Sequence, residues 1–229
     1  MSLSIRTLGT TRARFLDVLC IILLFSSQLF GQDSETFDMV DEPKNINDCI
    51  ELINMQLNDS LKSVIKSWPE DEFVANVHMG YGLNLRNRWG LWRGSRLSKY
   101  FNDLGIFHPD DMPGIILTSY YRHLTQRELQ LDTQVNYYKL YWLAIEPPSK
   151  EDRPNGLKDV EFGSARYYRL AKDNKPGFLH FQTNSKTDST WIYDYHFGWK
   201  NLSIQQLEYI ESIKSGSLEI VLIDIFGEN

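Results

Sequence analysis

The stretch RNRWGLWRGSRLSKYF, residues 86–101, carries five positive charges and two tryptophans but no acidic side chain. Its second half has the pattern of a helix start. Ser95 follows a glycine and can cap the first turn, and Leu97 and Phe101 then recur at helical spacing. Gly105 supplies the left-handed conformation in which helices commonly end. We therefore predict a short helix here, within an α-helical domain.

Under one interpretation, this stretch is internal framework. Large aromatic side chains dominate the cores of small domains, so Trp89 and Trp92 would be buried there. Arg86 and Arg96 would then pair with carboxylates of the same domain, because buried charges need partners. The nearest candidates in the sequence are Asp103, Asp110 and Asp111.

Under the other interpretation, the stretch is a surface for an unknown protein partner or an anionic ligand. Arginine forks bind carboxylate or phosphate bidentately and stack on aromatic rings, and both residue types are common at interface hot spots. This basic-aromatic surface would consist of Arg86, Arg88, Trp89, Trp92, Arg93 and Arg96.

Helical periodicity extends to both sides of the stretch and predicts an all-α domain of about five helices over residues 46–145. Toward the N-terminus, apolar residues at three- and four-residue steps from Ile46 to Val64 predict one long helix. A second helix is expected to end near Gly80. Toward the C-terminus, the sequence HPDDMPG begins another helix, for which Asp110 is the expected cap.

This part of the chain resembles a known family. The pattern GLNLRNRWGLWRGSRLSKYFNDLGIFHPDDM is similar to that of a bacterial family catalogued as a domain of unknown function, over about residues 46–142. In that family, Asn is usual where this chain has Arg88, and Ser is usual where it has Pro113. The resemblance implies a helical domain but no reaction, substrate or partner. The C-terminal half of the chain lies outside it.

The period of the sequence changes after EPPSKEDRPNG, residues 146–156, which has the proline-rich, charged composition of a linker. Residues 157–229 alternate in polarity and predict a small β-β-β-α-β unit. Ser203 is the expected cap of its helix. The apolar run LEIVLIDIF, residues 218–226, is expected to be a buried strand. The predicted fold class is therefore α+β, with an all-α domain followed by this unit.

The sequence TWIYDYHFGW, residues 190–199, is expected to form one strand of that unit. Alternation along a strand would place five aromatic side chains on one face, either as a platform for a ligand or packed against the helix. They are Trp191, Tyr193, Tyr195, Phe197 and Trp199.

The N-terminus has the order of a secretory signal peptide. Three arginines precede the apolar run VLCIILLF, residues 18–25, which is too short to span a bilayer comfortably, and small and polar residues follow. We predict a signal peptide over residues 1–31, a flexible segment over 32–45, and export to the periplasm or the extracellular space. The alternative is a membrane anchor made by an uncleaved N-terminal segment. No other membrane span is expected.

Composition and motifs exclude several functions. The formal net charge of −6 argues against nucleic-acid binding, which usually requires a basic domain. Cys49 shares a helical face with isoleucines, so we expect a buried, unreactive thiol. The sequence contains no H-E-x-x-H, C-x-x-C or phosphate-binding loop motif, and we expect no metal and no cofactor.

Three functional hypotheses follow. The first is a non-enzymatic binding module that uses the basic-aromatic surface. The second is a cell-envelope hydrolase with His108 and either Asp110 or Asp111 as acid–base residues, although helix capping and complementarity to the helix dipole are the favoured explanation of both aspartates. The third is a structural helical domain, with ligand binding by the aromatic C-terminal sheet.

Overall fold

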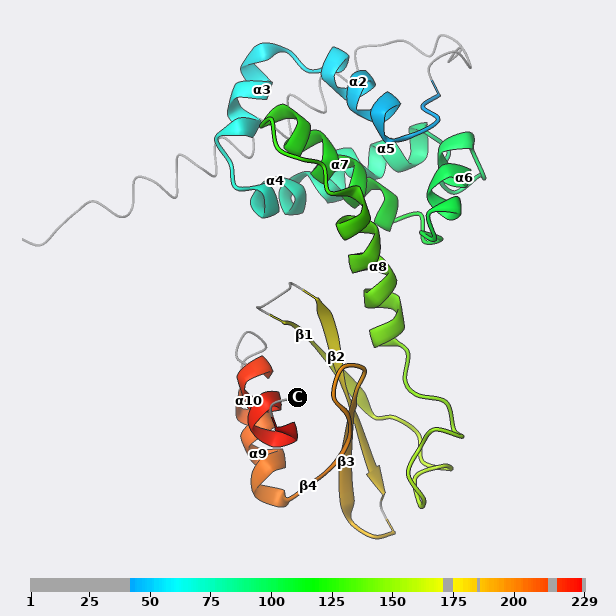
Figure 1. Ribbon diagram of the computed structural model, residues 1–229, viewed down its shortest axis with the longest axis vertical. Coiled ribbons are helices and arrows are strands. Elements are labelled where there is room, and N and C mark those ends of the chain that lie inside the picture. The colour runs from blue at the N-terminus through cyan, green and yellow to red at the C-terminus, as the bar shows by residue number, and fades with distance from the viewer. Residues whose placement is uncertain (1–41, 171–174, 185, 214–217, 228–229) are drawn as a thin grey trace, which may run out of the picture. The chain divides into compact units, whose positions relative to one another are not determined.

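The computed structural model describes residues 42–170, 175–184, 186–213 and 218–227. The chain divides into two compact units, the first ending at Val135 and the second beginning at Asn136. The first is helical and the second combines a four-stranded sheet with helices, so the predicted α+β class is confirmed (Figure 1). The predicted signal peptide and most of the predicted flexible segment lie outside the described residues.

The first unit begins with two helices where the sequence predicted one. They are α2 (Ile46–Gln56) and α3 (Asp59–Lys66). The chain turns at Asn58, whose side chain accepts a hydrogen bond of 2.9 Å from the backbone amide of Leu61 and so caps α3. The turn was missed because the apolar spacing continues across it. In α3, Leu61 and Ile65 are buried, whereas the sequence pattern predicted Val64 in place of Ile65.

The expected helix stop near Gly80 is also wrong. Helix α4 (Glu70–Val77) continues through one π-helical turn, η2 (His78–Gly82), into α5 (Leu83–Arg88). Gly82 is buried there, and a Cβ added to it would lie 3.3 Å from the Leu117 side chain and 3.4 Å from Pro113. The glycine therefore lets this helix closely approach the later helix that carries Pro113 and Leu117.

Helix α6 (Arg96–Asp103) starts as predicted, because the Ser95 hydroxyl accepts a hydrogen bond of 3.1 Å from the Ser98 amide. Helix α7 (Asp111–Leu124) has Pro113 in its first turn, where no backbone donor is needed. It is buried along nearly its whole length and packs against α2, α3, α4, η2 and α5. Helix α8 (Leu131–Ile145) follows. The core of the first unit is therefore built around α7.

The second unit contains an antiparallel sheet with the strand order β1-β2-β3-β4. The strands are β1 (Ser164–Arg169), β2 (Pro176–Asn184), β3 (Ser189–Asp194) and β4 (Gly198–Leu202). Residues 190–199 therefore form a hairpin and not the single strand that was predicted. The Asp194 carboxylate closes its turn by accepting hydrogen bonds from the amides of His196 (2.7 Å) and Phe197 (3.2 Å).

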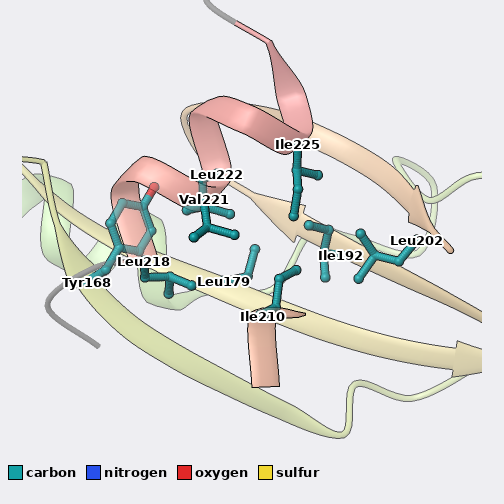
Figure 2. Close-up of a cluster of buried hydrophobic side chains, with 9 residues drawn as sticks. All are labelled: Tyr168, Leu179, Ile192, Leu202, Ile210, Leu218, Val221, Leu222 and Ile225. Carbon is teal, nitrogen blue, oxygen red and sulfur yellow. The ribbon is translucent and has the colours of Figure 1, made fainter. Parts of the chain in front are cut away.

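The apolar run LEIVLIDIF is a helix, α10 (Leu218–Phe226), and not the predicted strand. Its buried residues recur at helical spacing, which a nine-residue run of nearly uniform hydrophobicity conceals. With α9 (Ile204–Ser212), whose predicted Ser203 cap is confirmed as a capping box with Gln206, it covers one face of the sheet. Figure 2 shows the resulting core: Tyr168, Leu179, Ile192, Leu202, Ile210, Leu218, Val221, Leu222 and Ile225.

The opposite face of the sheet carries most of its aromatic residues and is covered by other parts of the same unit. The ring nitrogen Nε2 of His180 donates a 2.9 Å hydrogen bond to the carbonyl of Ala144 in α8. The amide of Gln182 donates to the carbonyls of Leu157 and Val160. The segment predicted as a linker is thus followed directly by residues that pack on the sheet.

We expect Gly177→Ala to destabilise the second unit by about 1–3 kcal/mol, the usual cost of overpacking. Gly177 pairs directly with Tyr168 across β1 and β2, and an added Cβ would overlap the Tyr168 ring. The matched control is Gly163→Ala, because its Cβ would meet nothing closer than 4.0 Å. Urea unfolding of both variants measures the difference. Equal midpoints would show that the Tyr168 ring moves away at no cost.

Candidate functional site

The structure divides the basic-aromatic stretch into buried and exposed residues. Trp89 is 2% exposed and Leu91 is 1% exposed, and both belong to the core. Trp92, three residues further on, is 54% exposed. The two tryptophans, which the sequence could not distinguish, therefore have different roles: Trp89 supports the fold and Trp92 faces solvent.

A turn between two glycines presents Trp92. Gly90 and Gly94 have φ values of 60° and 70°, which L-residues with side chains rarely adopt. The carbonyl of Gly90 accepts hydrogen bonds from the amides of Arg93 (2.8 Å) and Ser95 (3.4 Å). The turn therefore has a defined geometry, and Trp92 and Arg93 lie exposed at its tip.

Arg86 supports Trp92 from α5. Its guanidinium carbon lies 4.8 Å from the centre of the Trp92 ring, within the range of a cation–π contact. One of its terminal nitrogens forms an ion pair with the Asp110 carboxylate. The Arg86 side chain is only 17% exposed, so this charge is largely withdrawn from solvent. Its Nε is buried and has no partner among the described residues.

Asp110 connects this arginine to two histidines. His78 Nε2 lies 3.1 Å from the Asp110 carbonyl, which can only accept, so the ring donates this bond. The Asp110 amide donates a weak hydrogen bond of 3.4 Å to His108 Nδ1. The His108 ring in turn meets the Trp92 ring edge-on at 6.3 Å. Arg86, Trp92, His108 and Asp110, all predicted from the sequence, therefore converge, and we call them the Trp92 cluster.

His78 was not singled out by sequence reasoning. It reaches Asp110 because the π-helical turn η2 brings it beside the first residues of α7. The two glycines of HMGYG, residues 78–82, were the sequence feature that could have drawn attention to His78. Asp110 holds the predicted cap position of α7, but its carboxylate makes no capping bond and pairs with Arg86 instead. Asp111, the other predicted acid–base candidate, is the first residue of α7.

The remaining basic residues of the stretch have other environments. Arg96 is 53% exposed and pairs with Glu42, at 3.6 Å between its Nε and the Glu42 carboxylate. Asp103 pairs with Lys99 at 2.9 Å, so Arg96 pairs with Glu42 and not with Asp103, whereas the expected pairing of Arg86 with Asp110 is confirmed. Arg88 and Arg93 are exposed. Glu42 thus contacts the start of α6.

A groove and an ion-pair network of the first unit lie apart from the Trp92 cluster. A groove of about 600 Å³ is lined by residues of α2, the end of α7 and the α7–α8 loop, among them Glu51, His123 and Arg127. Glu70 holds this loop through ion pairs of 2.7 Å with both Arg122 and Arg127. None of the predicted site residues lines this groove.

Among the described residues of the second unit, Asp194 is the one fully buried carboxylate. Besides closing the β3–β4 turn, it accepts a 2.8 Å hydrogen bond from the Tyr168 hydroxyl. Burial raises the pKa of Asp194 and also that of Tyr168. His196, its neighbour in the turn, lies 2.9 Å from the Pro176 carbonyl through Nε2 and donates to it. These contacts are structural and leave no open acid–base pair.

Residues 42–124 match the family described as a domain of unknown function (DUF6794). The match confirms the resemblance seen in the sequence, begins at Glu42 and ends at the last residue of α7. It therefore contains the complete Trp92 cluster. No curated protein and no solved structure matches the chain.

The described residues contain neither a metal-binding cluster nor a membrane-spanning helix. In the described ranges, no set of three or more His, Cys, Asp or Glu side chains could hold a metal ion. Among those same residues, no helix combines the length and apolar character needed to cross a membrane. Cys49 is buried as predicted, and burial raises its pKa.

We expect Trp89→Ala to destabilise the first unit by about 3–5 kcal/mol, the usual range for a large aromatic removed from a core. Trp92→Ala should cost less than about 1 kcal/mol, because it loses an exposed cation–π contact. The two substitutions are matched, since the residues share one turn. Urea unfolding followed by circular dichroism measures both. Equal destabilisation would assign Trp92 to the framework.

Proposed function

We propose that the helical unit is a non-enzymatic binding module whose contact surface centres on Trp92 and Arg93, with Arg86 beneath the tryptophan. The observation that carries the proposal is the contrast between the two tryptophans. Trp89 is buried, whereas Trp92 is 54% exposed on a turn that two positive-φ glycines define. A large aromatic side chain that the core does not need is available for a partner.

The contacts beneath Trp92 favour binding for a physical reason. Association costs free energy for every side chain that must be ordered, and this cost falls when the side chain is already held in place. Arg86 lies against the ring, and Asp110 in turn holds Arg86. Trp and Arg are also the residues most enriched among those that dominate binding energy at interfaces.

The same contacts give less support to the hydrolase. His108 Nδ1 lies 4.0 Å from the nearest Asp110 carboxylate oxygen, so the two predicted residues are neighbours. However, the carboxylate is already paired with Arg86, so it is not free to take a proton from a substrate. The one cysteine in the described residues is buried.

The hypothesis that the aromatic sheet is a binding platform has even less support. Tyr193 and Trp199 pair across β3 and β4, and their rings lie 5.1 Å apart. Phe162, from the segment before β1, stacks on Trp199 at 6.0 Å. Tyr195 and Phe197 lie in the hairpin turn, so the five aromatic residues do not share one continuous face.

We also propose that the protein is exported. The support is the order of an arginine-rich start, the apolar run at residues 18–25 and the small and polar residues that follow. An exported binding module would meet its partner in the cell envelope or outside the cell. This proposal is independent of the surface on the helical unit.

The binding surface can be tested by site-specific photo-crosslinking in the cells that naturally produce the protein. A benzoylphenylalanine at position 93 should give discrete, light-dependent adducts of higher mass. The same probe at Lys66, an exposed residue of α3, is the matched control and should give none. Adducts of equal yield at both positions, or none at position 93, would refute the proposal.

Export can be tested by fractionating cells that make the wild-type chain or Leu23→Arg, which interrupts the apolar run. We expect the wild-type protein outside the cytoplasm and at least about tenfold less of the variant there, because a charged residue in such a run is strongly unfavourable. Equal distribution of the two chains would contradict the proposal. A cytoplasmic marker enzyme controls for lysis.

A further inference from the structure

Exposed apolar side chains gather around the Trp92 cluster. Among the described residues of the first unit, five large apolar side chains are exposed, and four of them lie within three residues of the cluster or of His78 along the chain. Single exposed apolar residues are normal on a protein, whereas a group of them marks an interaction site. The four are Met79, Leu83, Trp92 and Phe107.

Two of these side chains come from the continuous helix formed by α4, η2 and α5. Met79 directly follows His78, whose ring donates to the Asp110 carbonyl. Leu83 lies one helical turn before Arg86, which pairs with the Asp110 carboxylate. Residues three apart on a helix are neighbours, with about 5–6 Å between their Cβ atoms. Both apolar residues therefore lie close to the start of α7.

The other two come from the segments on either side of α6. Trp92 lies in the turn that precedes this helix, and Phe107 lies in the loop that follows it. Phe107 directly precedes His108, whose ring meets the Trp92 ring at 6.3 Å. Phe107 is 74% exposed and Met79 is 79% exposed, so both side chains protrude into solvent. The four apolar side chains thus protrude from three separate segments around one region.

The surroundings of these side chains are basic. Residues 73–102 contain five basic side chains and no acidic one. Arg88 and Arg93 are exposed, and Arg93 makes no ion pair with the residues that the structure describes. Two acidic residues lie nearby at the start of α7: Asp110, which is paired with Arg86, and Asp111, which is half-buried. The group is therefore complementary to a negatively charged partner.

We propose that this surface binds the anionic face of a phospholipid membrane without spanning it. The exposed arginines pair with lipid phosphates, the tryptophan ring lies at the level of the headgroups, and the other apolar side chains reach the acyl chains. The lipid-binding surface consists of Met79, Leu83, Arg88, Trp92, Arg93 and Phe107.

The shape of this surface favours a membrane over a protein partner. A helix or peptide is usually held in a groove or along a strand edge, and the groove of about 600 Å³ is lined by residues 47–51 and 123–129, none of which belongs to this surface. Side chains that protrude singly from separate segments fit a lipid surface, because lipids rearrange around each of them. The inference rests on the proposed function, whose surface it uses, and names its partner.

Lipid contact can be measured with the environment-sensitive fluorophore NBD attached to Asn87→Cys in the full chain. Asn87 is an exposed residue of α5, one turn from Leu83. The chain also carries Cys20→Ser, which leaves only the buried Cys49, and Leu23→Arg, which interrupts the N-terminal apolar run. With phosphatidylcholine vesicles that contain about 30% phosphatidylglycerol, the emission should increase and shift to shorter wavelength.

Two controls define where and why the lipid is contacted. The same fluorophore at Lys66→Cys, an exposed residue of α3, should remain in water and show no shift. Vesicles of phosphatidylcholine alone should bind at least about fivefold more weakly, since the attraction of one arginine to an anionic membrane is worth about this factor. An equal response at positions 66 and 87, or no response at position 87, would overturn the inference.

The apolar contribution is tested by combining Trp92→Ala with Phe107→Ala, read out by the fluorophore at position 87. Both side chains are exposed, so the fold should be retained. The partition coefficient onto the anionic vesicles should fall by about tenfold or more, since burial of one large apolar side chain is worth at least this factor. The matched control is Ile204→Ala, an exposed apolar residue of the second unit, which should leave it unchanged. Equal partition of the double variant and the parent chain would contradict the inference.

The two proposals can fail separately. A vesicle response at position 87 without any adduct at position 93 in cells would leave lipid binding standing and refute the binding module. Protein adducts at position 93 without a vesicle response would do the reverse and identify the partner of this surface as a protein. Adducts at position 93 with the added mass of one phospholipid, together with the response at position 87, would support both.

Discussion

The first unit depends on the burial of helix α7. This helix packs against α2, α3, α4, η2 and α5, and Ile115, Ile116, Leu117 and Tyr120 on it are completely buried. A buried aliphatic or aromatic side chain contributes roughly 1.5–3 kcal/mol, so a helix buried on several sides orders every element around it. The position of its N-terminus is consequently fixed, and Asp110 lies there.

The Trp92 cluster follows from that constraint through two glycine-dependent features. Gly82 lets the π-helical turn approach Pro113 and Leu117, which brings His78 and Arg86 to the start of α7. Gly90 and Gly94 then reverse the chain so that Trp89 remains in the core while Trp92 lies over Arg86. A surface tryptophan held in this way is a consequence of how the core packs, although it contributes little to the core itself.

The second unit uses its buried polar side chains to hold its own segments together. Helices α9 and α10 cover one face of its sheet, and the end of α8 with residues that precede β1 covers the other. A sheet covered on both faces needs internal partners for its polar groups. Asp194, His180 and the side-chain amide nitrogen of Gln182 find them in backbone donors or acceptors and in Tyr168. Residues that look chemically active in the sequence are therefore used to close turns and hold segments together.

The sequence alone determined the α+β class, the change from helical to alternating pattern, the Ser95 and Ser203 caps and the buried Cys49, because each depends on neighbours within one or two turns. It also pointed to Arg86, Trp92, His108 and Asp110. Only the tertiary structure decided which tryptophan is buried, that Asp110 pairs with Arg86 instead of capping α7, and that residues 218–226 form a helix. The physical reason is the sequence separation of the interacting residues. Caps and periodicity involve near neighbours in the sequence, whereas burial and ion pairing depend on which distant segments are packed together.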